Sequence, residues 1–359
     1  MQLFDPITLR GMTARNRLWV APMCQYSAIA EDGLATDWHL AHYTTLARGG
    51  AGLVMVEATG VLPQGRISPR CLGLWDQEHA AALEPLVAGA HAAGAAIGIQ
   101  LNHAGRKAST YPGWGFDRTG TVPAAAGGWP TAGPSDVPFP GYEPPTALTL
   151  DGIDGIVEAF GTAARRAKQA GFDTVEIHGA HGYLIHQFLS PLSNTRTDEY
   201  GGTLENRARL LLRVAGAIRV AVGENYPVVA RLSASDWLEG GLTLDETIQV
   251  VTWLAESGVD LVDVSSGGNA PARIPIGPGY QVALADAVRR ATGMRTSAVG
   301  LVTEAGQAAQ IVLSGQADVV SVGRAVLRNP FFPLQVAAQL GVQVDYIPPQ
   351  YTRAWPVRH

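Results

Sequence analysis

The sequence predicts an α/β fold in which eight parallel strands alternate with helices, a (β/α)8 or TIM barrel. Eight short runs of apolar and β-branched residues recur along the chain, and longer Ala-rich stretches with helical spacing lie between them. The runs are apolar throughout, which is typical of parallel strands buried on both faces. Barrels of this type commonly occupy one long domain, so we expect a single domain over all 359 residues, 1–359.

The eight runs are the expected strands, and two of the intervening helices have clear ends. One helix is expected at Ile153–Gln169, stopping at Gly171, and another opens with a capping box formed by Thr243 and Glu246. The expected strands are Leu18–Met23, Gly52–Glu57, Ala96–Leu101, Thr174–His178, Val228–Ser233, Leu261–Ser265, Arg295–Gly300 and Asp318–Gly323.

Two segments depart from this alternation. Residues 111–145, after the third strand, are crowded with Gly, Pro and Trp and show neither strand nor helix period. Connectors of this composition are common, but such a long one in a compact domain more often forms a lid or a binding wall, so we expect an excursion that caps the barrel mouth. Residues 348–359 follow the eighth unit and contain Tyr351, Arg353 and Trp355, which predicts a tail that docks instead of fraying.

Composition excludes several partners. The net charge of −5 and the absence of a Lys/Arg run argue against nucleic acid. No apolar run approaches the ~18 residues of a membrane span, and the N-terminus does not resemble a signal peptide. The two cysteines, Cys24 and Cys71, are a weak case for a disulfide in a chain this long. We therefore expect a cytoplasmic protein without membrane or nucleic-acid partners.

Polar residues and glycines gather where the expected strands end, which is where barrel enzymes place their chemistry. Gly300 follows the seventh strand, while Gly323 and Arg324 follow the eighth. Loops at these two positions commonly bind phosphate through glycine N–H groups, and arginine adds a planar fork for phosphate oxygens. The spacing predicts a phosphate site, although glycines there could also only relieve crowding.

The fourth strand is followed by two histidines and a tyrosine. His178 and His181 could be metal ligands, although no third ligand lies nearby in the sequence, or histidines buried in the core. They could instead donate two hydrogen bonds to one substrate oxygen, with Tyr183 as a proton donor. Cys24, after the first strand, could be functional or a small buried hydrophobe, and Cys71 is interpreted as the latter.

Several long motifs together resemble the Old Yellow Enzyme family. They span residues 21–27, 100–107, 176–184 and 193–207, in the family's order. Cys24, where other branches carry Thr, and the closing residues 350–355 are similar to the thermophilic-like branch of ene-reductases. The departures are Asn102, Thr203 and Ala354, which stand where the family often has Ala, Ser and Gly, and they affect pocket shape and tail packing.

The resemblance implies a non-covalent FMN at the barrel mouth and no metal. Positive charge at the flavin N1/O2 edge would stabilise the reduced cofactor, and the thiol would tune its potential. By motif position, the residues implied to hold FMN are Ala21, Pro22, Met23 and Cys24 along the flavin, Ala58 and Gln100 at its ring, Arg231 at its N1/O2 edge, and Gly300, Gly323 and Arg324 at its phosphate.

The resemblance also implies the reaction. NADPH, or NADH as the alternative reductant, would reduce FMN, which would pass hydride to the β carbon of an α,β-unsaturated carbonyl or nitro compound. His178 and His181 would bind the activating oxygen, Tyr183 would protonate the α carbon, Cys24 would modulate the flavin, and Tyr26 would contact these small electrophilic alkenes. Arg353, with Trp355, would reach into the site of a neighbouring subunit, which predicts a homodimer or homotetramer.

Three alternatives were weighed. The iron–sulfur relatives with extra nucleotide-binding domains need more than two cysteines and a longer chain. A non-flavin barrel, such as a metal-assisted lyase or aldolase, would use His178 and His181 as ligands. A flavin-binding module without activity is disfavoured because binding alone needs neither Tyr183 nor the histidine pair.

Overall fold

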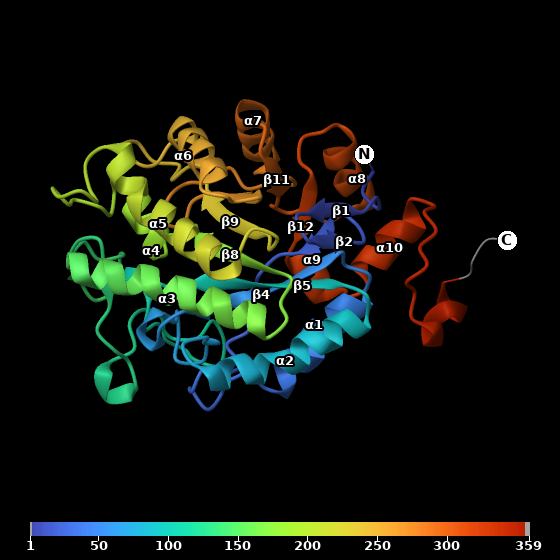
Figure 1. The fold of residues 1–359 in the computed structure, drawn as a ribbon, viewed down its shortest axis with the longest axis horizontal. Helices are drawn as coiled ribbons and strands as arrows, with labels where there is room; N and C mark the ends of the chain where they lie inside the picture. Colours follow the sequence, from blue (N-terminus) through green and yellow to red (C-terminus); the bar gives the residue numbers. More distant parts are fainter. Residues whose placement is uncertain (1, 356–359) are drawn as a thin grey trace.

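The computed structural model describes residues 2–355 and forms a closed barrel of eight parallel strands wrapped by helices (Figure 1). Each strand of the barrel overlaps one expected strand, which confirms the predicted fold class. Around the barrel the order is β10-β11-β12-β3-β4-β5-β8-β9. The strands are β3 (Leu18–Val20), β4 (Leu53–Gly60), β5 (Ala96–Asn102), β8 (Thr174–Gly179), β9 (Val228–Ser233), β10 (Leu261–Ser265), β11 (Arg295–Ala298) and β12 (Val319–Val322).

Two strands end two or more residues before their expected ends, each for a local reason. β3 ends at Val20, shortly before Pro22, which has no N–H to donate to a strand ladder. β11 ends at Ala298, because the chain turns at Gly300, where φ is +127°. Both shortened strands leave extra residues for the loops at the barrel mouth.

Helices form the outer layer of the barrel (Figure 1). The capping box predicted at Thr243 is present: its Oγ1 accepts from the Glu246 N–H at 3.2 Å, and Glu246 Oε2 accepts from the Thr243 N–H at 3.1 Å. The helices are α1 (Asp37–Arg48), α2 (Gln77–Ala92), α3 (Leu150–Gln169), α4 (Leu184–Leu189), α5 (Leu204–Val222), α6 (Leu244–Glu256), α7 (Val282–Thr292), α8 (Ala305–Leu313), α9 (Arg324–Arg328) and α10 (Phe332–Gln339).

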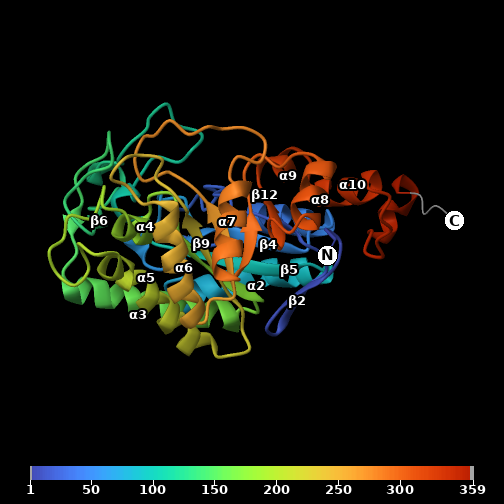
Figure 2. The same cartoon turned by 90° about the horizontal axis from the view of Figure 1, so that it is seen from above.

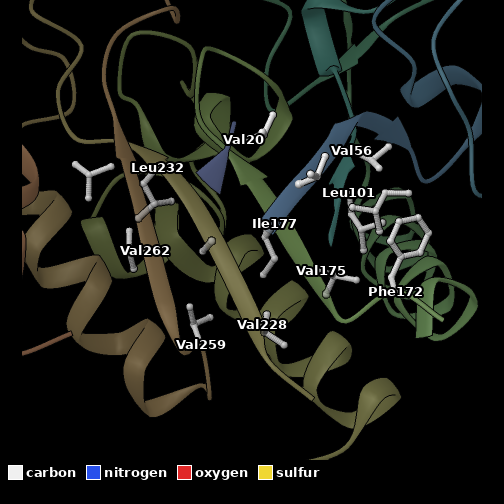
Figure 3. Close-up of a cluster of buried hydrophobic side chains, with 14 of the residues drawn as sticks. Val20, Val56, Leu101, Phe172, Val175, Ile177, Val228, Leu232, Val259 and Val262 are labelled. Carbon is white, nitrogen blue, oxygen red and sulfur yellow. The ribbon is translucent and has the colours of Figure 1, made fainter. Parts of the chain in front are cut away.

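The strands carry apolar side chains on both faces. One set, which includes Val56, Leu101 and Ile177, belongs to the large core shared with the surrounding helices (Figure 3). The other set fills the barrel interior and packs against a hairpin made of β1 (Ile7–Leu9) and β2 (Met12–Ala14). This hairpin, which the sequence patterns did not predict, closes the amino-terminal end of the barrel.

The excursion over residues 111–145 is mostly irregular and is pinned to the barrel mouth. It contains one 3-10 turn, Ala124–Ala126, and the strand β6 (Ala132–Gly133), which pairs with β7 (Thr146–Ala147) just beyond it. Arg196 donates to the carbonyls of Pro134 and Leu148 at 2.9 and 2.7 Å. Trp114 Nε1 donates to the Gln25 carbonyl at 2.8 Å, which joins the excursion to the loop after β3.

The carboxyl-terminal tail projects from the barrel beside α10 (Figure 2). It forms a 3-10 helix, Pro349–Ala354, in which Tyr351 packs its ring on Phe331 with centroids 5.4 Å apart. Arg353 is exposed. A cavity of about 720 Å³ separates the tail from α10 and is lined in part by Trp355. The predicted tail continues over residues 356–359, which lie outside the described part of the chain.

None of the helices in residues 2–355 combines the length and the apolar character that crossing a bilayer requires.

Candidate active site

A cavity of about 250 Å³ lies at the carboxyl-terminal end of the barrel, between the loops that follow β11 and β12. A larger cavity, of about 440 Å³, lies at the opposite end near the hairpin, and its lining holds none of the predicted site residues. The mouth cavity therefore marks the candidate site. Five predicted residues line it: His181, Arg231, Gly300, Gly323 and Arg324.

The mouth cavity is built to receive an anion. Its lining contains Arg231, Arg324 and Arg328 and no carboxylate. A Cβ on Gly300 would lie 3.0 Å from the Tyr280 ring, so this backbone conformation and spacing suit glycine alone. Guanidinium groups beside an open glycine backbone are suited to phosphate oxygens. Arg328, four residues after the predicted Arg324, is an additional candidate that the sequence reasoning missed.

The histidine pair and Tyr183 lie together at the carboxyl end of β8, with His178 in the strand and His181 and Tyr183 in the turn that follows. The ring centroids of His178 and His181 are 5.2 Å apart, and those of His178 and Tyr183 are 4.9 Å apart. His181 adopts φ +59°, an uncommon conformation for a residue other than glycine. Two hydrogen bonds fix the backbone of His181. The His181 N–H donates to Ser233 Oγ at 3.0 Å, and Lys107 Nζ donates to the His181 carbonyl at 2.7 Å.

Both histidines are uncharged at neutral pH. Burial, followed by the positive charge of Arg231, holds the pKa of each ring well below its ordinary value. His178 Nδ1 accepts the N–H of Ala180 at 3.3 Å, which leaves the ring proton on Nε2. His181 Nε2 lies 2.7 Å from Ser265 Oγ. Each neutral ring therefore has one N–H to donate.

Tyr183 is a buried phenol that keeps its proton. Burial is the main reason that its pKa is raised well above the ordinary value, and Cys24 and Tyr26 add to the effect. The ammonium of Lys107 lies 5.0 Å from the centre of the Tyr183 ring. Burial lowers the pKa of Lys107 to about 8. Lys107 was part of a sequence motif but was assigned no role there.

The loops after β3 and β4 bring the two cysteines together, Cys24 from the first and Cys71 from the second. Cys24 and Tyr26 pack against a buried apolar cluster that contains Ala58 and Cys71, and Tyr183 packs against the same cluster. A hydrogen bond with the Cys71 thiol, followed by burial, raises the pKa of Cys24, so Cys24 is a thiol at neutral pH. Cys71 is fully buried, as predicted, but it is also the neighbour of Cys24.

Gln100 and Arg231 lie at the ends of β5 and β9 and are held from within the barrel. Gln100 Nε2 donates to Glu176 Oε1 at 2.6 Å. Arg231 Nε lies 3.0 Å from Asp263 Oδ2. The two side chains form an ion pair, but Nε–H does not point at the carboxylate well enough to make a hydrogen bond. The sequence analysis assigned no role to Glu176 or Asp263.

Other predicted residues border the same mouth. A Cβ on Gly323 would lie 3.3 Å from Met23 Sδ, which places Met23 beside the phosphate loop. Pro22 lines a small cavity inside the barrel, and the Ala21 N–H donates to the Val322 carbonyl at 3.0 Å. The two predicted residues that are not brought to this mouth are Arg353 and Trp355, which lie in the projecting tail.

Within residues 2–355, no three His, Cys, Asp or Glu side chains are grouped so that they could hold a metal ion. The histidine pair therefore lacks the third protein ligand that a metal-assisted lyase would use.

Comparison with known proteins identifies the family of the chain. The family model described as "NADH:flavin oxidoreductase / NADH oxidase family" matches residues 2–343. The NADPH dehydrogenase of Geobacillus thermodenitrificans is 48% identical over 354 residues, covering 98% of both chains. The NADPH dehydrogenase of Halalkalibacterium halodurans is 44% identical and covers 99% of both.

Solved structures share the barrel. Morphinone reductase superposes with a TM-score of 0.79 at 29% identity, covering 97% of this chain and 92% of its own. The Old Yellow Enzyme homologue from Zymomonas mobilis gives 0.78 at 28% identity and covers all of both chains. A 2-naphthoyl-CoA reductase gives 0.85 at 28% identity, but this chain spans only 52% of its length. The chain thus belongs to the NADH:flavin oxidoreductase / NADH oxidase family, that of Old Yellow Enzyme, and is an oxidoreductase that uses FMN as cofactor and NADPH as reductant.

Proposed function

We propose that this enzyme is an ene-reductase, which reduces the carbon–carbon double bond of α,β-unsaturated carbonyl and nitro compounds. The observation that carries the proposal is the arrangement after β8, where two uncharged histidines lie beside a protonated phenol at the barrel mouth. This is a set of hydrogen-bond donors next to a proton donor, which an oxygen-activated alkene requires.

The residues at the mouth fit FMN. Gly300, Gly323 and Arg324 would hold the phosphate, and Arg328 supplies a further positive charge in the same cavity. Gln100 and Ala58 would bond the ring, Arg231 would lie at the N1/O2 edge, and the sides would be lined by Ala21, Pro22, Met23 and Cys24. When bound, FMN supplies a two-electron carrier that NADPH reduces and the alkene reoxidises.

The histidine pair would activate the substrate. A neutral His178 with its proton on Nε2 donates one hydrogen bond to the carbonyl or nitro oxygen, and His181 donates a second. Two donors withdraw electron density from the conjugated double bond and make its β carbon electrophilic. Because both rings stay uncharged, the donors are already in place before the substrate binds.

Tyr183 would complete the reaction by delivering a proton to the α carbon. Its raised pKa keeps the phenol protonated over the physiological range, so the proton is always available. Its ring packs against that of His178, which places it next to the residue that would hold the substrate oxygen.

Tyr26 and the excursion would form the substrate wall. Tyr26 packs near Tyr183, and a Cβ on Gly113 of the excursion would lie 3.0 Å from the Tyr26 ring. The excursion thus lies against Tyr26, in keeping with a lid over the substrate.

The assembly that we propose is a homodimer or homotetramer in the cytoplasm. Arg353 is exposed on a tail that projects from its own barrel, which is consistent with a contribution of Arg353 and Trp355 to the site of a neighbouring subunit.

The test separates the two half-reactions. We expect the purified protein to show an oxidised-flavin spectrum that bleaches with NADPH in the absence of oxygen and returns when cyclohexenone is added. In Tyr183→Phe the bleaching should keep its rate, while the return slows about 100-fold because the proton donor is lost. Tyr226→Phe, which removes a tyrosine hydroxyl at the opposite end of the barrel, is the matched control and should leave both rates unchanged.

A protein that stays colourless when FMN is supplied would contradict the proposed cofactor site. Reoxidation by cyclohexenone at the same rate in Tyr183→Phe and in the wild type would contradict the role of Tyr183.

A further inference from the structure

Buried charged side chains surround a small cavity inside the barrel, beneath the residues assigned to the flavin ring. The cavity has a volume of about 10 Å³, enough for one water molecule. Among the residues that line it, Glu176 of β8 and Asp263 of β10 are the titratable ones, and the other polar groups are the side chains of Ser297, Ser321 and Trp19. The interior of the barrel therefore places two carboxyl groups close together.

Glu176 is hydrogen-bonded to Gln100, a residue that we assign to the flavin ring. Its Oε1 accepts from Gln100 Nε2 at 2.6 Å, and the two residues are register partners in β8 and β5. Each side chain is about 2% exposed. The bond uses one N–H of Gln100 and so fixes how its amide group is turned. A protonated Glu176 can accept it on its carbonyl oxygen and keep its proton on the other oxygen.

Asp263 forms an ion pair with Arg231, the other residue that we assign to the flavin. Its Oδ2 lies 3.0 Å from Arg231 Nε, and its Oδ1 has no hydrogen-bond partner within the described part of the chain. Both side chains are buried, and they are register partners in β10 and β9. One guanidinium thus faces two carboxyl groups, and two ionised carboxylates would leave a net negative charge in a medium that solvates it poorly.

Of the two carboxyl groups, Glu176 is the one that is protonated at neutral pH. Burial, followed by the charge of Asp263, raises the pKa of Glu176 to about 8, while Arg231 and the bond from Gln100 oppose that rise. Burial also raises the pKa of Asp263, but Asp263 is in direct contact with the Arg231 guanidinium, which favours its ionised form. At neutral pH the group is therefore neutral overall, with Arg231 paired to Asp263 and Glu176 uncharged.

We propose that Glu176 is a positioning residue that stores a proton beneath the flavin, orients the Gln100 amide, and leaves Arg231 balanced by Asp263 alone. The proposal rests on the placement of FMN given above. FMN gains negative charge on reduction, and an ionised Glu176 would add a second negative charge below the ring and oppose that gain. The reduction potential of bound FMN should therefore fall further when pH rises through the pKa of Glu176.

The first experiment measures the reduction potential of FMN bound to the whole protein from roughly pH 6 to pH 10. This pH range extends to both sides of the raised pKa of Glu176. The wild type should show a downward inflection near the value of about 8. Glu176→Gln keeps an oxygen for Gln100 and cannot ionise, so it should lose that inflection and match the wild type at neutral pH. Glu158→Gln, on the exposed face of α3, is the matched control and should keep it. The pKa of Lys107 at the same mouth is also lowered to about 8, so the two proteins are compared with Lys107→Met present in both. An inflection that survives in Glu176→Gln on that background would overturn the proposal.

The second experiment needs no flavin. Infrared spectra of the ligand-free protein in D₂O should show the carbonyl band of a protonated carboxylic acid at neutral pH, which disappears at high pH and is absent from Glu176→Gln. Absence of this band from the wild type would overturn the proposal. If neither protein bound FMN, the proposed function would fail, and the infrared band would still decide whether Glu176 holds a proton.

Discussion

His178 and His181 show how burial prepares a side chain for catalysis. A solvent-exposed histidine gains a proton as pH falls through about 6.5, but burial and Arg231 lower the pKa of both rings well below that. We expect the dissociation constant of cyclohexenone, followed through the flavin spectrum, to stay flat over roughly pH 5.5 to 8, where ordinary histidines titrate. A dissociation constant that changes with pH, with a midpoint near pH 6.5, would contradict the proposal that both histidine rings are neutral when they donate.

The same shift predicts how stability depends on pH. A histidine whose pKa is lowered by folding binds protons in the unfolded chain before it does so in the folded one, so acid favours unfolding. This contribution is complete above the unfolded pKa of about 6.5 and is lost as the pH falls below it. The urea midpoint should drop between pH 7 and pH 5, by less in His178→Gln than in the wild type. Equal drops in the two proteins would show that His178 does not contribute.

Lys107 is a second residue whose contacts predict an effect. Its Nζ donates to the carbonyls of His181 and Gly268, at 2.7 and 2.9 Å, and so ties the turn after β8 to the loop after β10. Lys107→Met removes both bonds, and a charged donor of this kind contributes about 1.5–3 kcal/mol. We expect the KM for cyclohexenone to rise at least tenfold, while the FMN content is unchanged. Loss of FMN in proportion to activity would instead indicate a general disruption of the mouth.

From the sequence, residues near the carboxyl end of a strand could be placed at the barrel mouth. His178, Arg231 and Gly323 could be placed because residues at the carboxyl ends of parallel barrel strands converge on one mouth. The partners of these residues could not be placed. The bond from Gln100 to Glu176 joins residues 76 positions apart, and the one from Lys107 to Gly268 joins residues 161 apart. Such pairs depend on strand register, which apolar runs alone do not determine.

At the scale of the element, the hairpin at the amino terminus illustrates what the patterns missed. Barrel strands were predicted because burial on both faces leaves long apolar runs. β1 and β2 have three residues each, which is too short for a period to show, and their burial depends on a barrel that only the whole chain forms. Pro22 and Gly300 explain the strand ends that were misplaced, since a local conformation overrides an apolar pattern.

The hairpin also carries a stability prediction. Leu9 is fully buried and packs with Ile7, Met12 and the inner residues of the strands. Leu9→Ala should lower the free energy of unfolding by about 2–5 kcal/mol, the cost of a cavity in a packed core. Thr8→Ala, at the exposed middle of the same strand, is the control, and we expect its urea midpoint to stay near that of the wild type. Similar midpoints for the two variants would mean that the hairpin does not close the core.

At the scale of the whole molecule, the tail that carries Arg353 projects from the barrel (Figure 2), and Arg353 is not among the residues that line the mouth cavity. If Arg353 serves the neighbouring subunit, Arg353→Ala should lower the rate of cyclohexenone reduction without emptying the flavin site.

A mixing experiment decides which subunit's site Arg353 serves. In a mixed dimer of Arg353→Ala and Tyr183→Phe subunits, one site would combine an intact Tyr183 with an intact Arg353 from the partner, so about half the wild-type activity should return. If Arg353 served its own barrel, no site in the mixed dimer would hold both residues, and activity would not exceed the mean of the two variants.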